Sequence, residues 1–372
     1  MIGLYLHIPF CSRRCHYCDF VITTGRDKSR RRDFLPALEK EIRHTRDFFP
    51  GRTFETFYLG GGTPSVLEAS ELREVFRLVR DHFKIKENAE ITLEANPNDI
   101  SAEKAGAFKQ LGINRVSLGA QSFNDATLKK INREHTADDI GRSFRILRNA
   151  GFGNINLDLI LSLPGELFSD VEYSLNKAVG LGPEHISIYE LTIEKNTFFG
   201  GEFKKGRLGL PDEEIQLEML SHAREFLKAR GFWHYELLSY AKPGFESRHN
   251  LLYWANEEYL GLGPGAFSYF NGRRFRNSST VDEYFKKIGN DDWTAYEEET
   301  LTPDKKEIES LLLALRLSEG ALVSRFEPVI GKFLENINAL TEKGLLDKTA
   351  DRIYLTPRGQ FFAETVFAEL AS

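Results

Sequence analysis

Three cysteines, Cys11, Cys15 and Cys18, lie close together near the start of the chain, and they are its only cysteines. Clustered thiolates are typical ligands of soft metal centres, and the spacing CxxxCxxC offers three ligands for a site that needs four. A structural zinc site would normally take its remaining ligand from a second cysteine pair, which this chain lacks. The odd number of cysteines also disfavours a disulfide. An iron–sulfur cube with one iron left open explains the count best, and zinc is the alternative.

The elements that must position these cysteines follow from the hydrophobic periodicity. Short β-rich runs alternate with longer helical patterns over about the first 230 residues, which is typical of a parallel α/β sheet. The first helix is expected to begin near Asp33, and a later helix to span residues 212–230. Six βα units in succession predict a partial (β/α)6 barrel of the TIM type rather than an open doubly wound sheet. Its strands are expected at residues 2–8, 53–59, 90–95, 115–118, 154–160 and 185–191.

Polar and glycine residues follow several of the predicted strands. The cysteine segment, the run GGGTP at residues 60–64, Glu94, Gln121 and Asp158 all lie at or just beyond the carboxyl end of a strand. In a parallel barrel these ends share the face where active sites sit. The glycines let the backbone approach a ligand closely, and Glu94, which has apolar neighbours, needs a cationic partner. Arg133 can bind a carboxylate, and Asp158 can bind hydroxyl groups.

The pattern changes beyond Arg230. Another strand is expected at residues 234–240, followed by the segment SRHNLLYW at residues 247–254 and an acidic linker at residues 290–303. We therefore expect three parts in the chain. They are a barrel at residues 1–231, connecting strands at residues 232–295, and a mostly helical, winged-helix-like domain at residues 296–372.

The last part predicts helices near residues 304–318 and 330–343, a hairpin near residues 345–356 and a final helix, which together resemble a winged helix. The second of these helices balances lysines against glutamates, so it presents no basic face to DNA. The net charge of −6 also disfavours a nucleic-acid partner, because binding to phosphates needs a basic surface.

The composition, with 41% hydrophobic and 28% charged residues, is that of an ordinary globular protein. No apolar run approaches the length of a membrane span, and residues 1–10 lack the pattern of a secretion signal. Free thiols persist in reducing compartments. We therefore expect a cytoplasmic protein with, at most, a transient contact with a membrane.

Several segments carry a resemblance to a known family. CxxxCxxC after an N-terminal strand is the signature of the radical S-adenosylmethionine (SAM) superfamily, in which the methionine part of SAM completes the ligands of a [4Fe-4S] cluster. The segments GGGTP, LEANP, VSLGAQSF, INREHT and LDLILSLPG resemble those of its HemN/HemW family. The resemblance implies that Cys11, Cys15 and Cys18 hold the cluster. It also implies contacts with SAM from Tyr5, Tyr17, Gly61, Gly62, Thr63, Glu94, Gln121, Arg133 and Asp158.

Two functions compete within this family. The oxygen-independent coproporphyrinogen III oxidases (HemN) carry a motif that resembles CxxxCxxCxC and extend ahead of the first strand. This chain has Phe20 at the last position of that motif, and its first strand is expected to begin almost at Met1. Both features favour the heme chaperones (HemW). The pattern HNxxYW, which contains His249, is also seen in that branch, where the histidine is associated with heme binding, and histidine is an apt axial ligand for heme iron.

The resemblance thus implies a heme chaperone, a monomer or weak dimer that binds the cluster, SAM and heme and passes heme to an acceptor protein. Residues 265–269 read GAFSY, with Phe267 where the family more often has histidine, which removes one candidate for a second heme ligand. We assign no catalytic residue and favour a carrier over an enzyme. A coproporphyrinogen III oxidase is the first alternative. The second is a radical SAM enzyme that modifies another substrate, with His249 merely structural.

Overall fold

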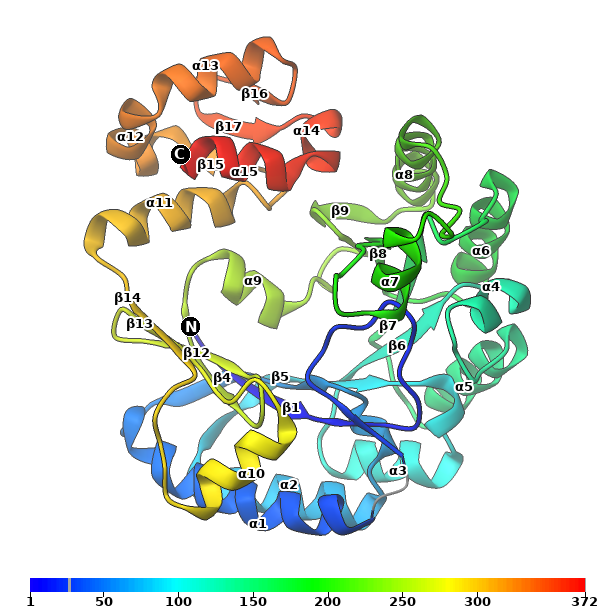
Figure 1. Ribbon diagram of the computed structural model, residues 1–372, viewed down its shortest axis with the longest axis vertical. Helices are drawn as coiled ribbons and strands as arrows, with labels where there is room; N and C mark the ends of the chain where they lie inside the picture. The colour runs from blue at the N-terminus through cyan, green and yellow to red at the C-terminus, as the bar shows by residue number, and fades with distance from the viewer. Residues whose placement is uncertain (26–27, 372) are drawn as a thin grey trace.

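The computed structural model, which describes residues 1–25 and 28–371, has a twelve-stranded sheet at its centre. Its middle strands curve around one interior, with helices on the outer side (Figure 1). Because β8 pairs with β10 and β1 pairs with β11, the sheet stays open among the described residues, which confirms the predicted partial barrel. Six of the strands run parallel in chain order: β1 (Ile2–Ile8), β4 (Thr53–Gly61), β5 (Lys84–Ala95), β6 (Arg115–Gln121), β7 (Ile155–Leu161) and β8 (His185–Glu190).

The helices that connect these strands pack against the outer face of the sheet. In α2, Leu72, Val75, Phe76 and Val79 follow the helical spacing and are at most 2% exposed, so this stripe faces the core. The first helix begins at Lys28, ahead of the start predicted near Asp33. The helices are α1 (Lys28–Thr45), α2 (Ala69–His82), α3 (Ala102–Gln110), α4 (Asp125–Lys130), α5 (Ala137–Asn149), α6 (Phe168–Gly180), α7 (Phe198–Lys204) and α8 (Glu213–Lys228), with 3-10 turns at Arg46–Phe48, Pro64–Val66 and Pro97–Asp99.

Further strands extend the sheet at both ends. On one side β11 (Glu258–Leu262) runs parallel to β1, and β12 (Phe267–Phe270), β13 (Arg273–Arg276) and β14 (Glu297–Thr300) follow antiparallel. On the other side β10 (Ser239–Ala241) and β9 (Trp233–Glu236) form a hairpin, so the single strand expected at residues 234–240 is wrong. The linker expected at residues 290–303 contains β14, because ion pairs of 2.7 Å and 3.2 Å join Glu298 and Glu297 to arginines of β13.

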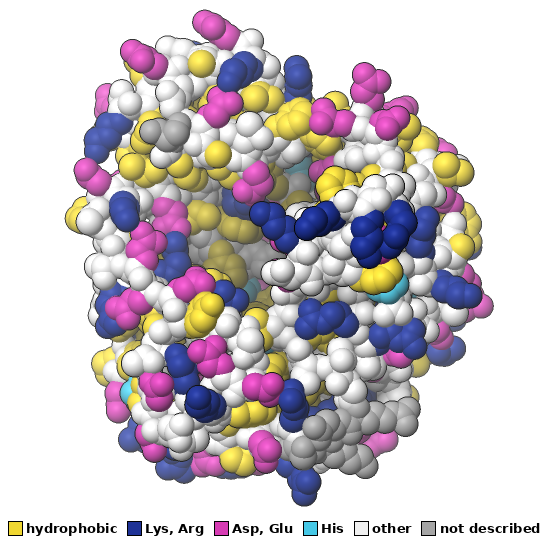
Figure 2. All heavy atoms as spheres, in the orientation of Figure 1, with side chains coloured by type: hydrophobic (Ala, Val, Ile, Leu, Met, Phe, Trp, Pro, Cys, Tyr) yellow, Lys and Arg dark blue, Asp and Glu magenta, His cyan; other side chains and the backbone are white. Residues whose placement is uncertain are grey.

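Two more helices pack near the strands that flank β1. The first, α9 (Arg248–Trp254), contacts β1 and β4, and α10 (Val281–Gly289) contacts α1. The HNLLYW segment is therefore a helix, and its N-terminus is capped by Ser247, whose Oγ accepts the Asn250 backbone N–H at 3.4 Å. The space-filling view shows this face of the molecule hollowed where α9 lies (Figure 2).

The end of the chain is mostly helical and has a hydrophobic core of its own, with Leu311, Phe326, Leu340 and Val366 among its buried members. Its three strands form a separate antiparallel sheet in the order β15-β17-β16, as expected for a winged-helix-like unit. The domain boundaries at residues 231 and 295 stay predictions. The elements are α11 (Pro303–Ala314), β15 (Ala321–Leu322), α12 (Val323–Lys332), α13 (Leu334–Glu342), β16 (Leu346–Lys348), β17 (Arg352–Leu355), α14 (Pro357–Phe361) and α15 (Ala363–Ala371).

The two faces of the parallel strands differ in chemistry, because successive side chains of a strand point to opposite faces. The outward side chains are apolar and join the main hydrophobic core, as Leu59, Leu93 and Leu118 do with 0% exposure. The inward ones are largely polar, as with Thr92 and Ser117. No helix within the described residues is long and apolar enough to cross a bilayer.

Candidate metal and cofactor site

A cavity of about 580 Å³ opens at the carboxyl ends of the parallel strands. The structure brings most of the predicted site residues to its wall, although they come from segments far apart in the chain. Tyr5 and His249 are the exceptions, since neither lines this cavity. Those that do are Cys11, Cys15, Tyr17, Cys18, Gly61, Gly62, Thr63, Glu94, Gln121, Arg133 and Asp158.

The cysteine segment begins in β2 (Phe10–Cys11), which pairs in parallel with β3 (Thr23–Thr24). The Sγ atom of Cys11 lies 3.4 Å from Thr63 Oγ1, and Arg133 donates from Nη1 to Cys15 Sγ at 3.5 Å. Burial raises the pKa of Cys11 to about 12 and also raises that of Cys18, so these two thiols keep their protons until a metal displaces them. A cube takes each thiolate on a different iron, so its ligands line one cavity, as these three do, and need not converge on a point. Among the described residues no three such side chains converge on a single metal ion.

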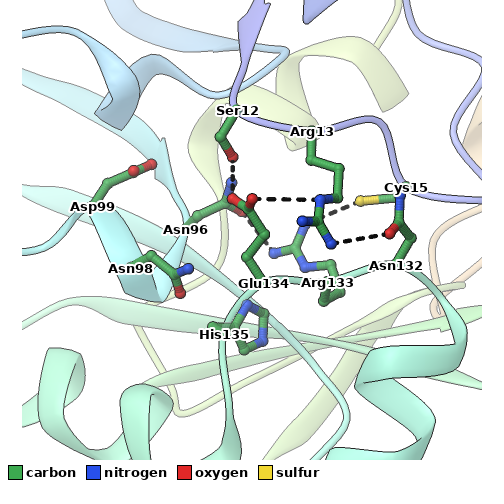
Figure 3. A pocket seen from close by; sticks show the side chains of 10 residues that line it. All are labelled: Ser12, Arg13, Cys15, Asn96, Asn98, Asp99, Asn132, Arg133, Glu134 and His135. Atoms are coloured by element: carbon green, nitrogen blue, oxygen red, sulfur yellow. Dashed lines mark hydrogen bonds and ion pairs between the residues drawn. The ribbon is translucent and has the colours of Figure 1, made fainter. Parts of the chain in front are cut away.

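Residues 132–134 hydrogen-bond to the cysteine segment around a small cavity of about 20 Å³ (Figure 3). Ser12 donates to Glu134 Oε2 at 2.6 Å, and Arg13 donates to Asn132 Oδ1 at 3.2 Å. Arg133, between these two partners, donates to Asn96 Oδ1 at 2.6 Å and to the Gly119 carbonyl oxygen at 2.7 Å. The loop after α4 therefore ties the cysteine segment to β5 and β6.

The GGGTP loop is joined to the same segment through its backbone. The N–H of Gly62 donates to the Ile8 carbonyl at 2.8 Å, and that of Thr63 donates to the Phe10 carbonyl at 2.8 Å. A Cβ on Gly62 would lie 2.8 Å from that Phe10 oxygen, which shows why glycine is needed there. Gly61 has a φ of +108°, in the region that glycine adopts without strain.

Two of the carboxyl groups that line the cavity, Glu94 and Asp158, belong to the predicted set. The hydroxyl of Tyr58 donates to Glu94 Oε1 at 2.8 Å, and Asp158 accepts from Ser117 Oγ at 2.9 Å and from Asn156 Nδ2 at 2.8 Å. Enclosure in the barrel raises the pKa of Glu94 to about 7 and raises that of Asp158 as well. A ligand that brings a cationic group would favour their ionised forms. Arg133, on the same wall, can pair with an anionic group of that ligand.

Gln121 lies at the end of β6, beyond a break in register between Gly119 and Gln121, and has a φ of +66°. This bulge keeps the side chain on the cavity wall. Sequence reasoning missed other residues on the wall, among them Asn96, Ser117 and Tyr189. The alternation of the strands could have found Ser117, because it precedes Gly119 by one full period of β6.

His249 lies in the barrel interior, away from this cavity, and is 1% exposed. Its Nδ1 is 2.7 Å from Thr56 Oγ1 and its Nε2 is 2.8 Å from the Tyr253 hydroxyl, so both ring nitrogens are engaged. Burial lowers its pKa to about 3, so the ring is neutral at physiological pH. Tyr5 lies beside it, with its hydroxyl 3.2 Å from His7 Nδ1. The arrangement does not fit a ligand of heme iron, which needs a nitrogen with a free lone pair.

The chain is similar to known proteins over nearly its whole length. The radical SAM superfamily matches residues 5–178. The "Heme chaperone HemW" of Bacillus subtilis (strain 168) is 37% identical, with 99% of this chain and 98% of the relative covered. The protein of the same name from Lactococcus lactis is also 37% identical, with 98% and 95% covered. The chain belongs to the HemW family of the radical SAM superfamily. Membership implies a [4Fe-4S] cluster and SAM, and the thiols and cavity described above fit both.

A solved structure confirms the fold. Coproporphyrinogen III oxidase (HemN) from Escherichia coli, described as a radical SAM enzyme, superposes with a TM-score of 0.89 over 99% of this chain and 89% of its own. The two sequences are 24% identical, so this likeness concerns the fold alone. HemW-family membership and the radical SAM barrel are thus as predicted from the sequence.

Proposed function

We propose that this chain is a heme chaperone that binds a [4Fe-4S] cluster, SAM and heme and passes heme to an acceptor protein. The observation that carries the proposal is the 37% identity to the B. subtilis heme chaperone over 99% of the chain. Phe20, which stands where the oxidase motif has a further cysteine, supports a chaperone over an oxidase. We also propose that the protein is cytoplasmic, because its free cysteines suit a reducing compartment, and that it is a monomer or weak dimer.

The predicted residues that line the cavity each have a role in this proposal. Cys11, Cys15 and Cys18 would hold three irons of the cluster, which leaves the fourth iron open to SAM. Glu94 would pair with the positive charge of SAM, on its ammonium or its sulfonium group, and Arg133 would bind its carboxylate. When bound, the cluster and SAM supply reductive cleavage of a carbon–sulfur bond, and the chain orients SAM and excludes water.

The remaining residues of the predicted set hold the rest of SAM. Gly61, Gly62 and Thr63 would contact the amino group of SAM, and Asp158 would bind the ribose hydroxyls. Gln121 and Tyr17 line the same wall and contact the nucleoside. Heme binding is proposed for the chain as a whole, without a ligand residue, because both nitrogens of His249 are engaged inside the protein.

The test starts from protein whose cluster is reconstituted without oxygen. One sample is titrated with heme and followed by its Soret absorbance, then mixed with apomyoglobin, which reports transfer. A second sample receives coproporphyrinogen III and SAM. We expect a stoichiometric Soret band, transfer to apomyoglobin and no decarboxylated product. Repeated turnover of coproporphyrinogen III would overturn the proposal in favour of the oxidase, and failure to bind heme would overturn it outright.

A further inference from the structure

A column of side chains runs through the barrel interior from the cavity to α9, and we call it the interior column: Glu94, Tyr58, His249 and Tyr253. At its upper end the Tyr58 hydroxyl donates to Glu94 Oε1 at 2.8 Å. The Tyr58 ring stacks on the His249 imidazole, with centroids 5.0 Å apart and planes inclined by 28°. At the lower end Tyr253 holds His249 Nε2 at 2.8 Å. The four side chains form one continuous set of contacts.

Two glycines leave the room that the interior column occupies. A Cβ on Gly60 would meet Tyr58 Cε1 at 2.9 Å and Glu94 Oε1 at 3.1 Å. A Cβ on Gly3 would meet His249 Cε1 at 3.2 Å. The column is therefore packed tightly against β1 and β4, and Tyr58 cannot tilt without disturbing either Glu94 or His249.

The backbone around His249 is anchored to the strand that carries Glu94. The N–H groups of Arg248 and His249 donate to the two carboxylate oxygens of Glu90, each at 3.1 Å. Glu90 and Glu94 both belong to β5, and Thr56, which holds His249 Nδ1, belongs to β4 together with Tyr58. Both ends of the column are thus fixed to the same pair of strands.

From these contacts we infer that Tyr58 and His249 are positioning residues that hold Glu94 in place for the cationic group of its ligand. His249 acts through Tyr58, since it does not line the cavity. The inference rests on the proposed function, in which SAM supplies the cation. It assigns the histidine of the HNxxYW pattern to the support of the SAM site instead of to heme iron.

The titration of Glu94 gives this role a measurable signature. Enclosure raises the pKa of Glu94 to about 7, whereas the hydrogen bond from Tyr58 lowers it. A cation binds the ionised carboxyl, so affinity for SAM should strengthen as the pH rises through 7. Removal of the Tyr58 hydroxyl should move that midpoint to higher pH. The charged and titratable groups that face Glu94 are Tyr5 on β1, Tyr58 on β4, Arg115 on β6, Asp158 on β7 and Tyr189 on β8.

The first experiment compares Tyr58→Phe with wild type, both with a full cluster, by anaerobic calorimetric titration of SAM between pH 6 and 8.5. We expect Tyr58→Phe to bind SAM about tenfold more weakly at pH 7, the size of effect typical of a lost hydrogen bond to a charged group, with its midpoint at higher pH. Tyr284→Phe is the matched control, because the Tyr284 hydroxyl donates at 2.7 Å to Glu41, another buried carboxylate whose pKa is raised to about 7. An unchanged affinity and midpoint in Tyr58→Phe would refute the inference.

The second experiment concerns His249. His249→Phe keeps an aromatic ring but loses both hydrogen bonds, and Tyr253→Phe removes only the partner of Nε2, so it serves if the first variant folds poorly. His234→Phe is the control, since His234 stacks on Tyr240 outside the column with centroids 4.5 Å apart. We expect weaker binding of SAM in both column variants, with the heme Soret band retained.

The outcomes separate this inference from the proposed function. Loss of the Soret band in His249→Phe with unchanged SAM affinity would show that His249 serves heme, and the inference would be wrong. If wild-type protein with a full cluster binds SAM at no pH, the proposed function itself fails. If wild type binds SAM and the column variants match it, only the inference fails.

Discussion

The outer and inner faces of the parallel strands share one backbone but differ in their side chains and in what those side chains contribute. Outside, apolar side chains such as Phe57 and Leu59 are buried against helices, and their removal from water stabilises the fold. Inside, Glu94, Asp158 and Arg115 lie in an enclosed space where charge is unfavourable unless it is paired. The comparison suggests that the outer face sets the stability of the fold and the inner face sets which ligand it can hold.

The largest effect that would test this division is on the cysteines. Replacing Cys15 by Ala should abolish the cluster, because a cube held by only two thiolates has lost one of its three protein ligands. Iron and sulfide content after anaerobic reconstitution would measure it, with Ser169→Ala, an exposed position on α6, as the control. The thermal unfolding of the metal-free protein should hardly change, and retention of the full iron content would contradict the assignment.

The next effect is on the outer face. Phe57 is 1% exposed and its ring centroid lies 5.4 Å from that of Phe76. Phe57→Ala should lower the free energy of unfolding by about 3–5 kcal/mol through lost burial and the cavity left behind. Urea denaturation of the metal-free protein would measure it, and Phe57→Leu should cost less. If Phe57→Ala lowers the free energy of unfolding by less than about 1 kcal/mol, the outer face does not set the stability as described.

A smaller effect is expected where the two faces meet, at the GGGTP loop. Gly62→Ala would press its Cβ onto the Phe10 and Ile8 carbonyls, at 2.8 and 2.9 Å, and so push the loop away from the cysteine segment. We expect a loss of about 1–3 kcal/mol of stability, as for an overpacked site, and faster loss of iron to a chelator. Gly153→Ala is the control, since no atom lies within 4 Å of its Cβ position. Equal behaviour of the two variants would argue against this tight junction.

The last effect, on SAM binding and on the pH dependence of stability, is expected for Glu94→Gln. The pKa of Glu94 is about 7 in the folded chain, above the ordinary value of about 4.3, so its contribution to stability is complete below pH 4.3 and is lost as the pH rises to 7. The amide should remove this slope from the pH dependence of unfolding without ligand. It should also weaken SAM binding at pH 8 by about tenfold or more. Any pH dependence near 7 that remains would then come from Glu190, which lines the same cavity and whose pKa burial raises to about 7. If the variant binds SAM as wild type does, Glu94 is not the partner of the SAM cation.

The sequence predicts the parallel strands well and singles out the cysteine segment, because both signals are local. Strand periodicity is visible in segments such as residues 2–8 and 154–160, and CxxxCxxC needs no partner from elsewhere to be recognised. The polar residues at strand ends could be placed on one face because the barrel topology fixes where those ends lie. The structure then brings Glu94, Arg133 and Asp158 to one wall.

The errors lie where pairing is set by distant contacts. β14 has the sequence EEET, with no apolar alternation, and is a strand because β13 offers arginines across the register. The hairpin of β9 and β10 is fixed by pairing of β10 with β8. The engagement of His249 depends on Thr56, which is 193 positions away in the chain, so no local pattern shows that both of its nitrogens are taken.

β14 also has a consequence for how the molecule behaves in solution. It is the last strand on its side of the sheet, and all four of its residues are exposed, three of them glutamates. A strand from another copy of the chain could pair with this edge strand only if the carboxylates of β14 lost their hydration or their ion pairs with arginines, which is unfavourable. The long sheet is thereby protected against growing from one molecule into the next.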